Sequence, residues 1–168
     1  MFAIMMRFFD APQPVAFTAS AERGQDLFGT GPSNPGIGCF ACHTPTMVTQ
    51  PKSETAALQS LTAHPFTDLL LHHMGKDLAD DITQGAATGD MFRTTPLWGV
   101  GQRRFFLHDG RTDDLLVAIQ THASPATVCE DASVSPCYGP SEADTVIDQF
   151  NALPARDKQA ILDFLRSL

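Results

Sequence analysis

The stretch Cys39-Phe40-Ala41-Cys42-His43 decides how the rest of the sequence is interpreted, because it sets two thiols and an imidazole at fixed spacing. Two cysteines three positions apart, followed directly by histidine, are the pattern to which c-type haem is attached. One helical turn brings both thiols to the vinyl groups of a porphyrin, and the next residue offers its imidazole to the iron. The pattern predicts thioether links at Cys39 and Cys42, one covalently attached haem (heme c), and His43 as an axial iron ligand.

Two other interpretations use the same residues. A disulfide or thioredoxin-like redox pair at Cys39 and Cys42 would be expected at a strand–helix junction and would not need His43. A zinc site would require a second Cys/His pair with ligand spacing. Cys129 and Cys137 are eight positions apart in a predicted loop and fit that requirement poorly. Haem attachment is the interpretation that uses the whole motif.

The length and composition of the chain limit the remaining possibilities. The 168 residues are the size of one domain, and 43% hydrophobic against 18% charged residues is enough for a buried core. With 11 Lys and Arg against 19 Asp and Glu, the formal net charge of −8 argues against a nucleic-acid partner. No apolar run approaches the roughly 20 residues that cross a bilayer. We predict an N-terminal extension over residues 1–19 and a single c-type cytochrome domain over residues 20–168.

The first nine residues, Met1 to Phe9, are apolar but do not form a convincing export signal. Arg7 interrupts the apolar run, whereas a signal peptide carries its positive charge first and then a longer apolar stretch. We expect this segment to pack on the core or to contact a partner complex, since exposed apolar strips mark partner surfaces.

Helical spacing dominates the sequence, and no alternating strand pattern is evident. The predicted fold class is therefore all-α: a cytochrome c-like helical domain with long loops around one covalently bound haem. Helices are predicted over Ala21–Phe28 (capped by Ser20), Pro65–Met74, Asp113–His122, Glu142–Leu153 and Pro154–Leu168.

A second axial ligand is predicted at His122. It shares the apolar face of its predicted helix with Leu115 and Ile119, where an imidazole without a partner would be costly and an iron would satisfy it. Met91, in a loop well after the motif, is the less favoured alternative. The remaining candidates for the second axial ligand are Met47, His64, His72, His73, Met74 and His108.

Together these residues resemble the C-terminal haem half of the di-haem oxidoreductases, relatives of bacterial cytochrome c peroxidase. The resemblance implies a haem domain in which a distal ligand falls fourteen residues after His108, at His122. It also implies that His108 lines the haem edge or fixes its loop through Asp109 and Arg111. The stretches that carry the match are Arg23-Gly24, Leu27-Phe28, Cys39–Pro45, His64–His72, Phe92–Gly99, Leu107–Arg111 and Leu153–Leu165.

The sequence also departs from that family. The family has two haem motifs and this chain has one, and a haem held by two histidines would have no open position for peroxide. We therefore expect a mono-haem c-type cytochrome that transfers electrons through a bis-histidine six-coordinate haem, as a subunit of or donor to a larger redox complex. The alternative is one haem half of a di-haem peroxidase-type oxidoreductase.

Three further expectations follow from the comparison with that family. The Cys129–Cys137 loop looks like an addition to the family pattern and is predicted to be closed by a disulfide. The resemblance implies a periplasmic or otherwise exported protein, because haem is attached to such cytochromes outside the bacterial cytoplasm. The expected partner is a redox protein or a membrane-associated complex.

Overall fold

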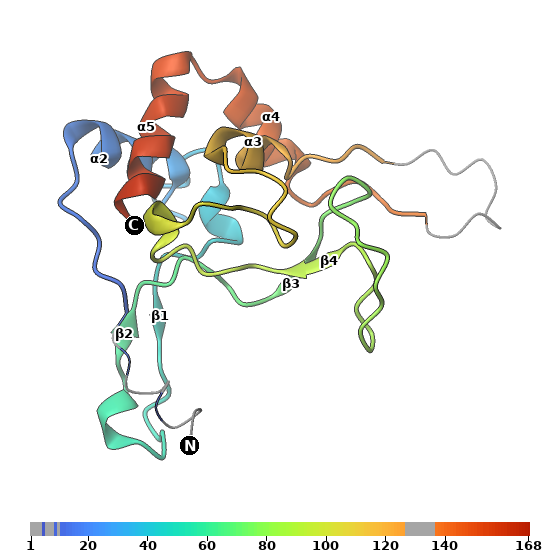
Figure 1. Ribbon diagram of the computed structural model, residues 1–168. Coiled ribbons are helices and arrows are strands. Elements are labelled where there is room, and N and C mark those ends of the chain that lie inside the picture. The colour runs from blue at the N-terminus through green and yellow to red at the C-terminus, as the bar shows by residue number, and fades with distance from the viewer. Residues whose placement is uncertain (1–4, 6–8, 10, 127–136) are drawn as a thin grey trace.

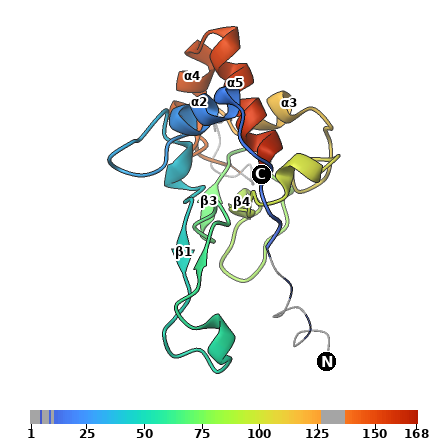
Figure 2. The same cartoon turned by 90° about the vertical axis from the view of Figure 1, so that its left-hand side faces the viewer.

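The computed structural model describes residues 5, 9, 11–126 and 137–168, and its helices gather at one end of the molecule (Figure 1). From the same end a narrow hairpin extends away, as both views show (Figure 2). The α-helices are α2 (Ala19–Phe28), α3 (Leu115–Gln120), α4 (Asp144–Ala152) and α5 (Ala155–Ser167). Short 3₁₀ turns are η1 (Cys39–Ala41), η2 (Ala56–Leu58) and η3 (Val100–Gln102). The strands are β1 (Met47–Val48), β2 (Thr62–Ala63), β3 (Leu71–His73) and β4 (Met91–Arg93).

The core forms where α2 packs against α5. The helices approach closely because Gly24 has no side chain: a Cβ there would overlap the Ala160 carbonyl group. Beside this contact, the Arg23 guanidinium makes two 2.8 Å hydrogen bonds to the Asp157 carboxylate. A bidentate pair of this kind fixes the relative position of the two helices as well as their distance.

Aromatic rings fill the space below the helix pair. Phe164 of α5 is fully buried, and the rings of Phe28 and Phe66 lie edge-on to it at centroid distances of 5.4 and 5.7 Å. Such edge-to-face arrangements add to the apolar burial energy. The same core includes Ala21, Ile37, Val100, Phe106, Leu115, Ala118, Phe150, Ile161, Leu165 and Leu168.

The prediction of an all-α fold is wrong. The described residues are 32% helical and 11% strand, so the protein is mixed α/β. Strands β1 and β2 form one antiparallel pair, and β3 and β4 form another in which His72 lies opposite Phe92. These strands are only two or three residues long. An alternating pattern needs about four residues to be recognised, so strands this short have no periodic signal in the sequence.

The helix predicted over Pro65–Met74 is also wrong. Phe66 and Leu69 adopt left-handed backbone angles, with φ of 54° and 61°, which no α-helix tolerates. The Thr67 hydroxyl accepts the N–H of Leu69, and the Asp68 carboxylate accepts the N–H of Leu70. These side chains take the hydrogen bonds that a helical backbone would have made, and the chain turns and continues into β3.

The other predicted helices are present with shifted ends. Helix α2 begins at Ala19 with Thr18 as its cap, because the Ser20 hydroxyl is used to donate to Asp163 of α5. Helix α3 is capped by Asp114, whose carboxylate accepts two backbone N–H groups. Within the described ranges, no helix combines the length and apolarity needed to span a membrane. Most of the apolar segment Met1 to Phe9 lies outside the described residues.

Candidate functional site

The five residues of the Cys39–His43 motif form a single tight turn. Gly38 precedes η1 with a φ of 99°, a conformation that suits glycine, and the N–H of His43 donates to the carbonyl of Cys39. Both cysteines are free thiols and both are half-buried. The turn therefore carries two unpaired sulfur atoms and an imidazole within five consecutive residues.

The protonation of these thiols argues against two of the alternative interpretations. Desolvation raises the pKa of Cys39 to about 12. Desolvation, with the nearby carboxylates of Asp68 and Glu142, also raises the pKa of Cys42. Redox-active Cys-x-x-Cys pairs and zinc ligands need a stabilised thiolate, which depends on a lowered pKa. These surroundings instead keep both sulfur atoms protonated.

His43 and His122 come together although they are far apart in the sequence. Their ring centroids are 6.5 Å apart and the ring planes are inclined by 57°. The Nδ1 of His43 donates to the carbonyl of Phe66 at 3.1 Å, and the Nδ1 of His122 donates to the carbonyl of Ala118 at 2.8 Å. Both bonds fix the ring orientation and leave the two Nε2 atoms with no hydrogen-bond partner among the described residues.

Both imidazoles are in the form that binds metals. Desolvation, followed by the effect of neighbouring His122, lowers the pKa of His43 to about 4. Desolvation also lowers the pKa of His122, outweighing the opposing carbonyls of Ala118 and Ile119. At neutral pH the two rings are uncharged, and a neutral imidazole nitrogen is a good metal ligand.

This geometry fits a haem. Two imidazoles that bind one metal ion from opposite sides, with bonds of about 2 Å, have ring centroids roughly 6 Å apart. The observed separation of 6.5 Å between His43 and His122 is close to that value. The free thiols of Cys39 and Cys42 belong to the same turn as His43, which suits covalent attachment of the group that these rings would hold.

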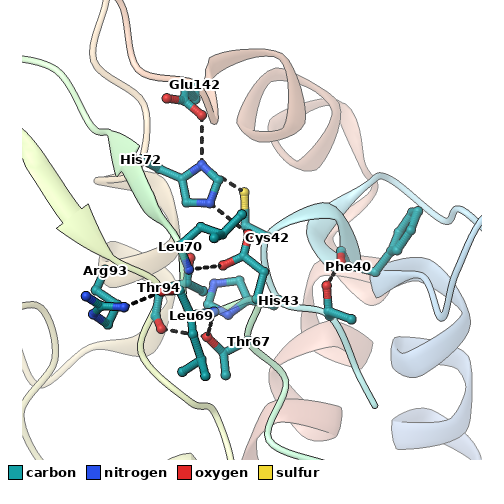
Figure 3. Close-up of polar contacts among 12 residues, drawn as sticks. Phe40, Cys42, His43, Thr67, Leu69, Leu70, His72, Arg93, Thr94 and Glu142 are labelled. Atoms are coloured by element: carbon teal, nitrogen blue, oxygen red, sulfur yellow. Dashed lines mark hydrogen bonds and ion pairs between the residues drawn. The ribbon is translucent and has the colours of Figure 1, made fainter. Parts of the chain in front are cut away.

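A second polar cluster surrounds His72, whose ring lies beside the Cys42 sulfur (Figure 3). The Nε2 of His72 is 2.9 Å from Asp68 and its Nδ1 is 2.7 Å from Glu142. Cys42, Asp68 and His72 offer ligand atoms within 4.8 Å of one another, a spacing that metal ions can use. Both ring nitrogens of His72 are, however, hydrogen-bonded to carboxylates, which leaves no ring lone pair for a metal. The cluster is an imidazole clamped by two acids.

Sequence reasoning missed this clamp. His72 was considered only as an iron ligand within a helix, and Glu142 lies seventy positions further along the chain. The one local signal was Asp68, four residues before His72. These two side chains form an ion pair although the segment between them is not helical.

The structure shows other partners for His108, Arg111 and Met91. His108 stacks on Phe92, with ring centroids 4.4 Å apart. Arg111 hydrogen-bonds to the Asp109 carboxylate at 2.6 Å and to the Asp77 carbonyl at 2.8 Å, so it fixes its loop. Met91 lies in β4 opposite His73. The predicted disulfide involves Cys129, which lies outside the described residues, and it stays a prediction.

A pair of buried imidazoles 6.5 Å apart, one of them in the same turn as two free thiols, is compatible with a haem-type redox protein. The comparison with known families agrees. Residues 16–168 match the family described as "di-haem oxidoreductase, putative peroxidase", and the chain belongs to that family. No curated protein and no solved structure matched the chain.

Proposed function

We propose that this chain is a c-type cytochrome that transfers electrons through one haem, attached at Cys39 and Cys42 and held by His43 and His122. The observation that carries the proposal is the pair of neutral imidazoles with centroids 6.5 Å apart, together with the two free thiols in the same turn as His43. A single iron would satisfy both unpaired Nε2 atoms at once.

The protein's own residues would hold both imidazole ligands in a fixed orientation before haem binds. The Phe66 carbonyl holds the His43 ring and the Ala118 carbonyl holds the His122 ring, so neither imidazole has to reorganise on binding. Hydrogen bonding at Nδ1 also makes Nε2 a stronger electron donor. The haem would supply one-electron chemistry. Two imidazoles stabilise ferric iron more than a histidine–methionine pair does, and we therefore expect a low potential.

Two strong ligands support electron transfer more than catalysis, because they leave no coordination position for a substrate. On this proposal the partner is another redox protein or a membrane-associated complex, to which this chain is a subunit or donor. Placement in the periplasm or another exported compartment belongs to the same proposal, since that is where the haem of such cytochromes is attached.

Visible spectroscopy of the purified chain, produced with a haem-attachment system, tests the proposal. We expect a low-spin, six-coordinate spectrum and a haem that stays with the protein on denaturation. His122→Met should replace the spectrum with that of histidine–methionine ligation and raise the potential, and His122→Ala should give a high-spin form. The matched control is His64→Ala, which removes an exposed imidazole bonded to Thr46 and should change neither property. A colourless chain, or a His122→Met spectrum identical to wild type, would contradict the proposal.

The family description favours a second candidate, in which this haem works with another in a peroxidase-type enzyme. The second haem would then come from a further domain or a partner. Adding peroxide to the reduced protein together with an electron donor separates the candidates. Sustained donor oxidation would support the enzyme, whereas an inert six-coordinate haem would support the electron carrier.

A further inference from the structure

The clamp around His72 holds a positive charge at a defined point. Each ring nitrogen of His72 faces a carboxylate oxygen, at 2.9 Å for Asp68 and 2.7 Å for Glu142. A carboxylate can only accept, so both nitrogens must donate, and an imidazole that donates twice is the protonated cation. The side chains of His72 and Asp68 are only 16% and 14% exposed, which limits the screening of their charges by water.

The surroundings favour the charged form of all three groups. Desolvation opposes protonation of His72, but its bonds to Glu142 and Asp68 outweigh it and raise the pKa of His72. The bond from His72, together with the N–H of His73, lowers the pKa of Glu142. Desolvation opposes ionisation of Asp68, but the Leu70 N–H and His72 outweigh it and lower the pKa of Asp68. The clamp therefore carries one positive and two negative charges.

The positive charge of His72 lies next to the Cys39–His43 motif. The Nδ1 of His72 is 3.8 Å from the Cys42 sulfur, and Figure 3 shows that this same nitrogen also contacts Glu142. Two other histidines of the neighbouring segments do not supply this charge: burial keeps His43 neutral, and the Nδ1 of His73 bonds to Asp90 instead. His72 makes no hydrogen bond to His43 or His122. It is thus the cation next to the proposed point of haem attachment without being an iron ligand.

We propose that His72 is a redox-tuning residue, whose imidazolium, held by Asp68 and Glu142 against the Cys42 sulfur, sets the potential of the haem bound there. The proposal rests on the proposed function. A cation beside the haem disfavours the more positive ferric state and raises the potential, while the two carboxylates lower it. Glu142 is 48% exposed and should act more weakly than Asp68.

Three single substitutions test the proposal through the midpoint potential of the haem-loaded protein. The measurements are made at about pH 6, where even an unshifted imidazole is mostly protonated. His72→Gln removes the cation and should lower the potential. Asp68→Asn removes an anion and should raise it, and Glu142→Gln should raise it by less. His64→Gln, which removes an exposed imidazole elsewhere, is the matched control and should leave the potential unchanged.

The opposite signs of the expected shifts in potential distinguish an effect of charge from structural damage. Damage to the fold near Cys42 would move His72→Gln and Asp68→Asn in the same direction, and that result would overturn the proposal. Unchanged potentials in both variants would overturn it too. Each variant must keep the low-spin spectrum of the parent for its potential to be compared. If the parent protein itself binds no haem through Cys39 and Cys42, the proposed function fails first, and the spectrum shows this before any potential is measured.

Discussion

At the scale of single residues, the surroundings of the Cys39 and Cys42 thiols raise their pKa, whereas a dithiol oxidoreductase lowers that of its reactive cysteine. Raising the pKa of Cys39 from 9.0 to about 12 lowers its thiolate fraction about a thousandfold at neutral pH. In the haem-free folded chain, Cys39 and Cys42 should therefore react with iodoacetamide much more slowly than a cysteine in a peptide. Mass spectrometry over time measures the rate, and full unfolding in urea, which should restore ordinary reactivity, is the control. A thiol that reacts faster than the peptide would contradict this prediction.

Local chemistry explains how much of the site could be predicted from the sequence. The motif Cys39–His43 depends on spacing alone, which sequence shows directly. His122 was predicted as a ligand because an imidazole on an apolar face needs a partner; its ring lies 6.5 Å from that of His43, and its role as an iron ligand stays a prediction. The clamp around His72 could not be found in this way, because its second acid, Glu142, comes from a distant segment that only the folded chain brings near.

At the scale of elements, the contact between α2 and α5 depends on Gly24. Alanine has the higher helix propensity by about 1 kcal/mol, so propensity alone would make Gly24→Ala stabilising. We expect the opposite, a loss of about 1–3 kcal/mol in the free energy of unfolding, because the new Cβ would overlap the Ala160 carbonyl group. Denaturant titration measures the difference. The matched control is Gly139→Ala, where the added Cβ meets no atom within 4 Å and stability should change little.

The elements that sequence predicted and those it did not differ in where their hydrogen bonds come from. Helices α2 and α3 have side-chain caps, and α5 has an apolar stripe, all of which can be recognised within about ten residues. The segment from residue 65 to 74 has helical spacing too. There, however, the side chains of Thr67 and Asp68 accept backbone N–H groups that a helix would use for its own hydrogen bonds. Strand β3 is then stabilised by pairing with β4, about twenty positions further along the chain, and no local pattern reveals that partner.

At the scale of the whole molecule, one ion pair links the two helices that close the fold, and it makes stability depend on pH. The hydrogen bond from Arg23, with the charges of Arg23 and Arg156, lowers the pKa of Asp157 below its ordinary value of 3.8. A carboxylate with a lower pKa in the folded state stabilises the fold above its unfolded pKa, and this stability is lost as the pH falls through the folded pKa. We expect stability to fall below about pH 4 in part through this residue.

A double-mutant cycle with Asp157→Asn and Arg23→Gln isolates the pair. Asp157→Asn should lower stability at neutral pH and flatten its decline in acid, as measured by thermal unfolding at a series of pH values. Adding Arg23→Gln to Asp157→Asn should cost little more, because the interaction is already lost. If the acid decline of Asp157→Asn matched that of the parent, another carboxylate would be responsible.

The packing of α2 on α5 also bears on the order of events during synthesis. Helix α2 and the turn with Cys39 and Cys42 leave the ribosome long before α5 is made, yet Phe164 of α5 occupies the centre of the core. Until that ring arrives, Phe28 and Phe66 can contact each other but lack the ring to which both lie edge-on in the folded protein. The core against which Cys39 packs is therefore completed only once the C-terminal helix has been made.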